Sequence, residues 1–145
     1  MIKSTTSDFK FRRGLAWSAF GSMERIWKAQ HLDLALKLRI FQASVLSVLL
    51  YGCESWIISE QLMIKINSFA TTCYRVLLGV KWSDRVPNED ILANVGRRPL
   101  VNEVRRRQLG WLGHVLRRHE DEPAAIFARN VPEHGTAKRG KPPLT

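Results

Sequence analysis

Residues 33–50, DLALKLRIFQASVLSVLL, decide the fold. Asp33 is placed to cap the start of a helix with its carboxylate. Apolar residues then recur every three or four positions, the spacing of one helical face, at Leu34, Leu38, Phe41, Val45 and Leu49. Leu46 and Leu50 add apolar surface on the opposite side. The stretch predicts a central helix that is buried on most sides.

This helix is too short and too polar to predict a membrane span. The longest uncharged run, residues 40–53, covers 14 positions and includes Gln42, Ser44 and Ser47. A membrane-spanning helix needs roughly 20 apolar residues. We therefore expect a soluble fold with no membrane partner.

Helical spacing continues on both sides of the central stretch, and no strand-like alternation persists. Ala16, Phe20, Met23 and Trp27 share one face of a helix over about 13–29. A third helix is expected from a cap at Ser59 to a stop at Gly79. Prolines at 87 and 99 predict a short helix ending near residue 96 and a longer one over about 99–118.

The predicted fold class is therefore all-α, an irregular bundle of about five helices with a disordered basic C-terminal tail. We divide the chain into a flexible N-terminus (1–12), one helical domain (13–119) and a tail (120–145) rich in proline, glycine and basic residues.

The composition favours a polyanionic partner. Lys and Arg number 23 against 13 Asp and Glu, so the net charge is +10 and the pI is about 10.3. A merely basic soluble protein is the alternative. Cys53 and Cys73 are too few for a disulfide framework and are interpreted as core residues in a reduced compartment. The polar opening, residues 1–10, shows no secretory signal, so we expect an intracellular protein, nuclear or cytoplasmic.

The positive charge concentrates in residues 97–118, where seven arginines face one acid, Glu103, giving 7 − 1 = +6. A helical winding of this segment at about 100° per residue separates two halves. The apolar half collects Leu100, Val101, Val104, Leu109, Leu112, Val115 and Leu116, with Arg105 and Gln108 intruding. The other half collects Arg106, Arg107, Gly110, Gly113, His114, Arg117 and Arg118, with Trp111 at the boundary.

A face of this kind offers charge-assisted donors, close approach at glycine and a stacking surface, which a phosphate backbone needs. The predicted nucleic-acid-binding residues are Arg97, Arg98, Arg106, Arg107, Trp111, His114, Arg117, Arg118, Lys138, Arg139 and Lys141. A solvated charged face is the alternative for the helix, and a solubilising end for the tail. The two glycines indicate close packing by RNA or by another helix.

The remaining tryptophans are predicted to pack in the core, namely Trp17, Trp27, Trp56 and Trp82. Because Trp82 falls in a loop over 80–86, a lid or a stacking residue is the alternative for it. No catalytic, metal-binding or cofactor-binding pattern is visible. The chain has no HExxH motif, no Gly-rich phosphate loop and no nucleophile elbow. His114 and His119, five residues apart, fit one helix face poorly.

Several short blocks of this sequence follow one another in the same order as in a known protein family. The most specific are LLYGCESW at 49–56 and RRRQLGWLGHVLR at 105–117. Others are KLRIFQA at 37–43, INSF at 66–69, CYR at 73–75 and LGVKWSD at 78–84. Over nearly the whole chain, from about residue 16 to 143, the sequence resembles the endonuclease and reverse-transcriptase polyproteins of non-LTR retrotransposons, LINE elements of the RTE or BovB-like kind.

The resemblance implies a thumb-like helical region that follows the palm of an RNA-directed DNA polymerase and grips template and primer. It implies RNA or DNA and the upstream palm domain as partners. The family's Tyr-x-Asp-Asp motif has no match here, so we expect a truncated fragment without polymerase activity of its own. Two departures are the sequence GRRPLV at 96–101, where the family commonly has a more apolar helix start, and the end at Thr145, where relatives continue. The alternative function is an inert transposon remnant that packs on a missing palm domain.

Overall fold

The computed structural model describes residues 4–118 and Pro123, and all regular structure within them is helical. The elements in chain order are α1 (Thr5–Ser22), α2 (Glu24–Lys28), α3 (Leu34–Phe41), η1 (Gln42–Leu46), α4 (Ser47–Leu49), η2 (Cys53–Ser55), α5 (Glu60–Leu78), η3 (Trp82–Asp84), α6 (Asn88–Val95) and α7 (Leu100–Leu116). Five of the α-helices have eight or more residues, which confirms the predicted all-α irregular bundle. The predicted tail, apart from Pro123, lies outside the described residues.

The central helix is present as predicted, but it contains a π-helical turn. The carboxylate of Asp33 accepts a hydrogen bond from the Leu36 amide at 2.8 Å and starts α3. η1 widens the middle of the helix by one π turn before α4 continues it. Phe41, Val45 and Leu49 are at most 1% exposed. The helix contacts α1 on one side and α5 on another, so it is central to the bundle.

The first helix begins earlier than the sequence predicts, at Thr5 rather than near residue 13. The Ser4 hydroxyl caps it by accepting from the Ser7 amide at 3.2 Å. The physical reason is tertiary: Phe9 is 1% exposed and packs edge-on against Trp56, with ring centroids 5.7 Å apart. Trp56 also donates its indole N–H to the Asp8 carboxylate at 2.8 Å. Residues 5–12, expected in the flexible N-terminus, therefore belong to α1.

An aromatic cluster joins the first helices to the central one. Phe20 stacks on Trp27 at 5.2 Å and meets Phe41 edge-on at 6.1 Å. The Trp27 indole donates to the Phe20 carbonyl at 2.8 Å across the break between α1 and α2. Lys37, 8% exposed, donates to the Trp27 carbonyl at 2.9 Å. This buried cation provides a hydrogen-bond donor for the Trp27 carbonyl in the last turn of α2.

The tryptophan predictions are partly wrong. Trp27 and Trp56 are buried as expected, whereas Trp17 is 37% exposed and packs one ring face against Phe69 at 4.6 Å. Trp82 is 87% exposed, because it lies in the single surface turn η3 and no helical face carries it inward.

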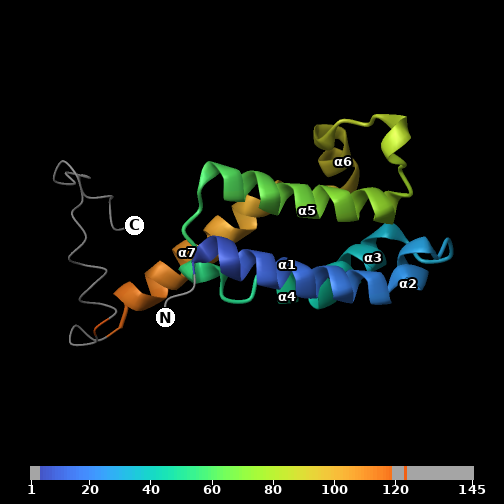
Figure 1. Ribbon diagram of the computed structural model, residues 1–145. Coiled ribbons are helices and arrows are strands. Elements are labelled where there is room, and N and C mark those ends of the chain that lie inside the picture. Colours follow the sequence, from blue (N-terminus) through green and yellow to red (C-terminus); the bar gives the residue numbers. More distant parts are fainter. Residues whose placement is uncertain (1–3, 119–122, 124–145) are drawn as a thin grey trace.

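The predicted caps of the second half are confirmed. The Ser59 hydroxyl accepts from the Leu62 amide at 3.1 Å, and Gly79 and Gly96 end α5 and α6 with φ of +70° and +66°. Pro87 and Pro99 directly precede α6 and α7. In Figure 1, α6 sits over one end of α5, and α7 returns past α5 and projects toward the end of the molecule where α1 begins.

Candidate nucleic-acid interface

The position of α7 is fixed at its start by a side chain from another helix. Pro99 supplies no side-chain cap, so the first amides of α7 need an acceptor from elsewhere. The Val101 amide donates to the side-chain oxygen of Asn67 in α5 at 3.0 Å. Leu100, Val101 and Val104 are at most 4% exposed on the same side. α7 is thus anchored to α5 through its first two turns.

Two turns further, Gln108 holds α7 against the η2 segment. Its side-chain amide donates to the carbonyls of Cys53 and Trp56 at 3.1 and 2.7 Å. The glutamine that seemed to intrude on the apolar half is therefore a structural clamp. The blocks at 49–56 and 105–117, which carry the resemblance most strongly, meet at this contact.

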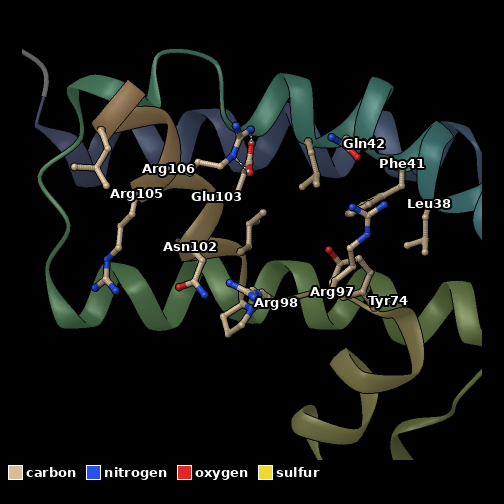
Figure 2. Close-up of a pocket in the computed structure, with 14 residues that line it drawn as sticks. Leu38, Phe41, Gln42, Tyr74, Arg97, Arg98, Asn102, Glu103, Arg105 and Arg106 are labelled. Carbon is tan, nitrogen blue, oxygen red and sulfur yellow. Dashed lines mark hydrogen bonds and ion pairs between the residues drawn. The ribbon is translucent and has the colours of Figure 1, made fainter. Parts of the chain in front are cut away.

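A pocket of about 550 Å³ lies beside the N-terminal half of α7 (Figure 2). One wall comes from the central helix and includes Leu38, Phe41 and Gln42. The opposite wall is α7 with the turn before it. Four arginines line this wall, namely Arg97, Arg98, Arg105 and Arg106, against one acid, Glu103, so the local charge is 4 − 1 = +3. Tyr74 of α5 also lines the pocket.

Glu103 orders two of the arginines. Its carboxylate accepts from Arg106 at 2.7 and 2.9 Å and from Arg107 Nε at 3.0 Å. The hydrogen bond from Arg106 is the main reason why the pKa of Glu103 lies below its usual value. The Arg106 side chain stays 74% exposed, so the ion pair orients its guanidinium without burying it.

Arg107 donates to the same Glu103 carboxylate as Arg106 but is less exposed. Its side chain is 31% exposed, and its guanidinium is near enough to the Cys53 thiol in the η2 segment to oppose the rise in the pKa of Cys53 that burial causes. The prediction placed both arginines on one open face. Arg107 is instead directed toward η2 because it follows Arg106 by one residue, or roughly 100° around the helix. It stabilises the η2 contact and leaves Arg106 to the pocket.

The second half of α7 carries the remaining predicted residues. Trp111 is 49% exposed, and His114 accepts from Arg118 Nε at 3.4 Å. Arg117 lies in line with Arg106, because eleven residues make about three helical turns. Gly110 and Gly113 fall between these two arginines along the same face. A Cβ at Gly110 would meet nothing within 4 Å, and one at Gly113 would meet only the Arg117 guanidinium. Neither glycine serves close packing between the described helices.

The apolar half of α7 was expected to be buried along the whole helix, and beyond Gln108 most of it is exposed. Val115 is buried, but Leu109, Leu112 and Leu116 are 69%, 39% and 40% exposed. The helix continues past the described elements that pack on its first half, as Figure 1 shows for its projecting end. Helical periodicity alone does not indicate where the partner surface stops.

Arg105 is the pocket arginine that the prediction missed. The winding placed it within the apolar half, yet it is exposed, and its Nη2 lies 3.7 Å from the Met63 sulfur. If the helical winding had been centred on Leu100 and Val104 as the buried face, Arg105 would have been predicted on the exposed side. The predicted tail residues Lys138, Arg139 and Lys141 lie outside the described residues.

The cysteines have the environment expected of core residues. Both are buried and unpaired with each other. Burial raises the pKa of Cys53 to about 11 and raises that of Cys73 further, so both thiols are protonated at neutral pH. In the part of the chain that the structure describes, no group of three or more His, Cys, Asp and Glu side chains could hold a metal ion. Nor is any helix there both long and apolar enough to cross a membrane.

Comparison with known proteins supports a transposon origin. A putative uncharacterized transposon-derived protein of Caenorhabditis elegans is 27% identical over 137 residues, which cover 92% of this chain and 49% of the relative. The chain thus spans about half the length of that relative. Residues 19–51, which include the whole central helix, match a family described as a domain of unknown function, DUF6451. No solved structure matches.

The Gln108 clamp can be tested by replacing its amide with an isosteric apolar group. In Gln108→Leu the Trp56 carbonyl loses the Gln108 donor and the Cys53 carbonyl keeps only the Trp56 amide, so we expect a loss of about 1–3 kcal/mol in the free energy of unfolding. Gln61→Leu, at the exposed start of α5, is the matched control. Urea denaturation followed by circular dichroism measures both. Equal stability of the two variants would contradict the clamp.

The Glu103 ion pairs give a pH dependence with a defined sign. Because the folded-state pKa of Glu103 is depressed, its carboxylate stabilises the fold above the ordinary value of 4.5, and this contribution is lost as the pH falls through the folded-state pKa. We expect the unfolding free energy of the wild type to fall more steeply than that of Glu103→Gln on acidification from neutral pH. Urea midpoints across this range provide the measurement, and parallel curves would be the contrary result.

Proposed function

We propose that this chain is a nucleic-acid-binding helical module derived from the reverse transcriptase of a non-LTR retrotransposon, without polymerase activity of its own. The observation that carries the proposal is the convergence of Arg97, Arg98, Arg105 and Arg106 on one pocket with a local charge of +3. The similarity to a transposon-derived protein supports the origin. The resemblance of the blocks at 49–56 and 105–117 supports the thumb-like region.

The chemistry of the arginines suits a phosphate backbone. Guanidinium groups bind phosphate oxygens through paired, charge-assisted hydrogen bonds. From Arg106 the basic face continues over Gly110 and Gly113 to Arg117, and a backbone can approach closely at the two glycines. Contacts of this kind are independent of base sequence. Binding is therefore tolerant of sequence and steeply dependent on salt.

Charge reversal tests this proposal. We expect the double variant Arg98→Glu/Arg105→Glu to bind RNA and DNA oligomers at least about tenfold more weakly at low salt. The slope of log affinity against log salt concentration should decrease in magnitude by about one to two. The matched control is Arg25→Glu/Lys28→Glu, which changes the net charge equally on α2, a helix that contributes nothing to the pocket. Fluorescence anisotropy at several salt concentrations measures both.

Two results would contradict the proposal. Absence of binding to RNA and DNA at low salt would show that the chain does not bind nucleic acid. An equal loss in the α2 variant shows that overall charge, and not the arginines of the pocket, governs affinity.

A second candidate function is favoured by the uncovered apolar stripe of α7. In this alternative the chain is a structural remnant whose exposed Leu109, Leu112 and Leu116 would pack on a missing palm domain. Because these leucines are exposed in the isolated chain, this alternative predicts that the chain self-associates. Light scattering should show a mass that rises with concentration, and Leu112→Lys should restore a monomer, whereas Ile64→Lys, at a 58% exposed position on α5, should not. A concentration-independent monomer in the wild type would rule this alternative out.

A further inference from the structure

The pocket beside α7 has two chemically different parts. The floor of its apolar part is formed by core side chains that are only 1–7% exposed, namely Leu38, Phe41 and Leu46 of the central helix and Leu100 at the start of α7. Leu109 of α7, which is 69% exposed, adds open apolar surface to the same lining. Its charged part is the arginine-bearing wall of α7 and the preceding turn. Figure 2 shows the Arg97 guanidinium on the side of Phe41 and Leu38, and Arg98 and Arg105 on the side of α5. A ligand here meets an apolar surface and several guanidinium groups together.

A phosphate backbone alone does not account for this arrangement. Backbone contacts need exposed positive charge and little else. A hollow of about 550 Å³ lies within the range of roughly 300–1,000 Å³ typical of small-ligand pockets. The apolar part therefore suits a flat, weakly polar group attached to a phosphate, and a nucleobase has these properties. Guanidinium planes also stack on bases, which places the arginines in contact with both parts of such a ligand.

Two amide side chains complete the pocket. Asn102 of α7 and Gln42 of the central helix are both exposed and lie on opposite sides of the hollow (Figure 2). An amide both donates and accepts hydrogen bonds, so it can pair with the edge of any base. In a duplex the Watson–Crick edge is already paired and the base is stacked on its neighbours. Only an unpaired base can enter a pocket of this kind.

We propose that the pocket takes one unpaired nucleotide, with its base against the Phe41 side and its phosphate among the arginines, so that the chain binds single strands more tightly than duplexes. The inference rests on the proposed nucleic-acid binding and adds the class of ligand. The Arg97 guanidinium is close enough to the Tyr74 phenol to oppose the rise in the pKa of Tyr74 that burial causes. The turn before α7 thus holds a cation at the inner end of the pocket.

The test compares three DNA ligands in the same buffer by fluorescence anisotropy. One is a mixed-sequence single strand, one is an abasic strand with the same number of phosphates, and one is a blunt duplex of the same length. We expect the base-bearing strand to bind roughly tenfold more tightly than the abasic strand, the effect of about one base contact. The duplex should bind more weakly than the base-bearing strand when affinities are compared per phosphate.

A variant localises the effect. Asn102→Phe adds bulk to the pocket wall without changing the charge, and it should reduce the preference for the base-bearing over the abasic strand to about one to threefold. Asn94→Phe, an exposed α6 residue outside the pocket, should retain the preference. Circular dichroism checks that both variants fold.

The outcomes separate the inference from the function on which it rests. Salt-dependent binding with equal affinity for base-bearing and abasic strands overturns the unpaired-nucleotide pocket and leaves backbone binding intact. A preference that survives in Asn102→Phe but disappears in Asn94→Phe places the base elsewhere and also overturns the inference. Absence of binding to all three ligands removes the proposed function, and the inference with it.

Discussion

The orientation of α7 depends on hydrogen bonds that its own sequence cannot make internally. Its first turn follows a proline without a capping side chain, and Asn67 of α5 accepts from the Val101 amide instead. Gln108 then satisfies two carbonyls of the η2 segment. Because these contacts lie on the buried side of the helix, they determine which arginines point outward. If α7 were rotated so that Val104 and Arg105 took the places of Arg105 and Arg106, the pocket would lose a cation.

The same anchoring explains why α7 changes character along its length. Up to Gln108 the helix is held by α5 and η2, and its apolar residues are covered. Beyond that point most of its leucines are exposed, while the line from Arg106 to Arg117 continues. The anchored half therefore holds the pocket, and the projecting half extends the charged face with little constraint from the rest of the fold.

Local signals in the sequence predict the helical fold class and several of the helix ends. Asp33, Ser59, Gly79 and Gly96 act through contacts within a few residues, and each is found in its predicted role. The predictions that were wrong depend on contacts between residues that are far apart in the sequence. The start of α1 depends on Phe9 meeting Trp56, far away in the chain, and the exposure of Leu109 depends on where the neighbouring elements end. The arginine-rich segment could be predicted, whereas the division between Arg105, Arg106 and Arg107 required the position of the partner helices.

The contact between the blocks at 49–56 and 105–117 bears on what the resemblance can support. Gln108 donates to the Cys53 and Trp56 carbonyls inside the fold, so packing and hydrogen bonding explain these three residues of the two blocks. A shared sequence at such positions supports a shared arrangement of helices. The residues that would bind a ligand lie mainly outside the contact, in the turn at 97–98 and on the open side of α7. Of the four pocket arginines, Arg97 and Arg98 lie outside the two blocks, whereas Arg105 and Arg106 lie within the second. Ancestry and binding therefore rest on residue sets that overlap only in part.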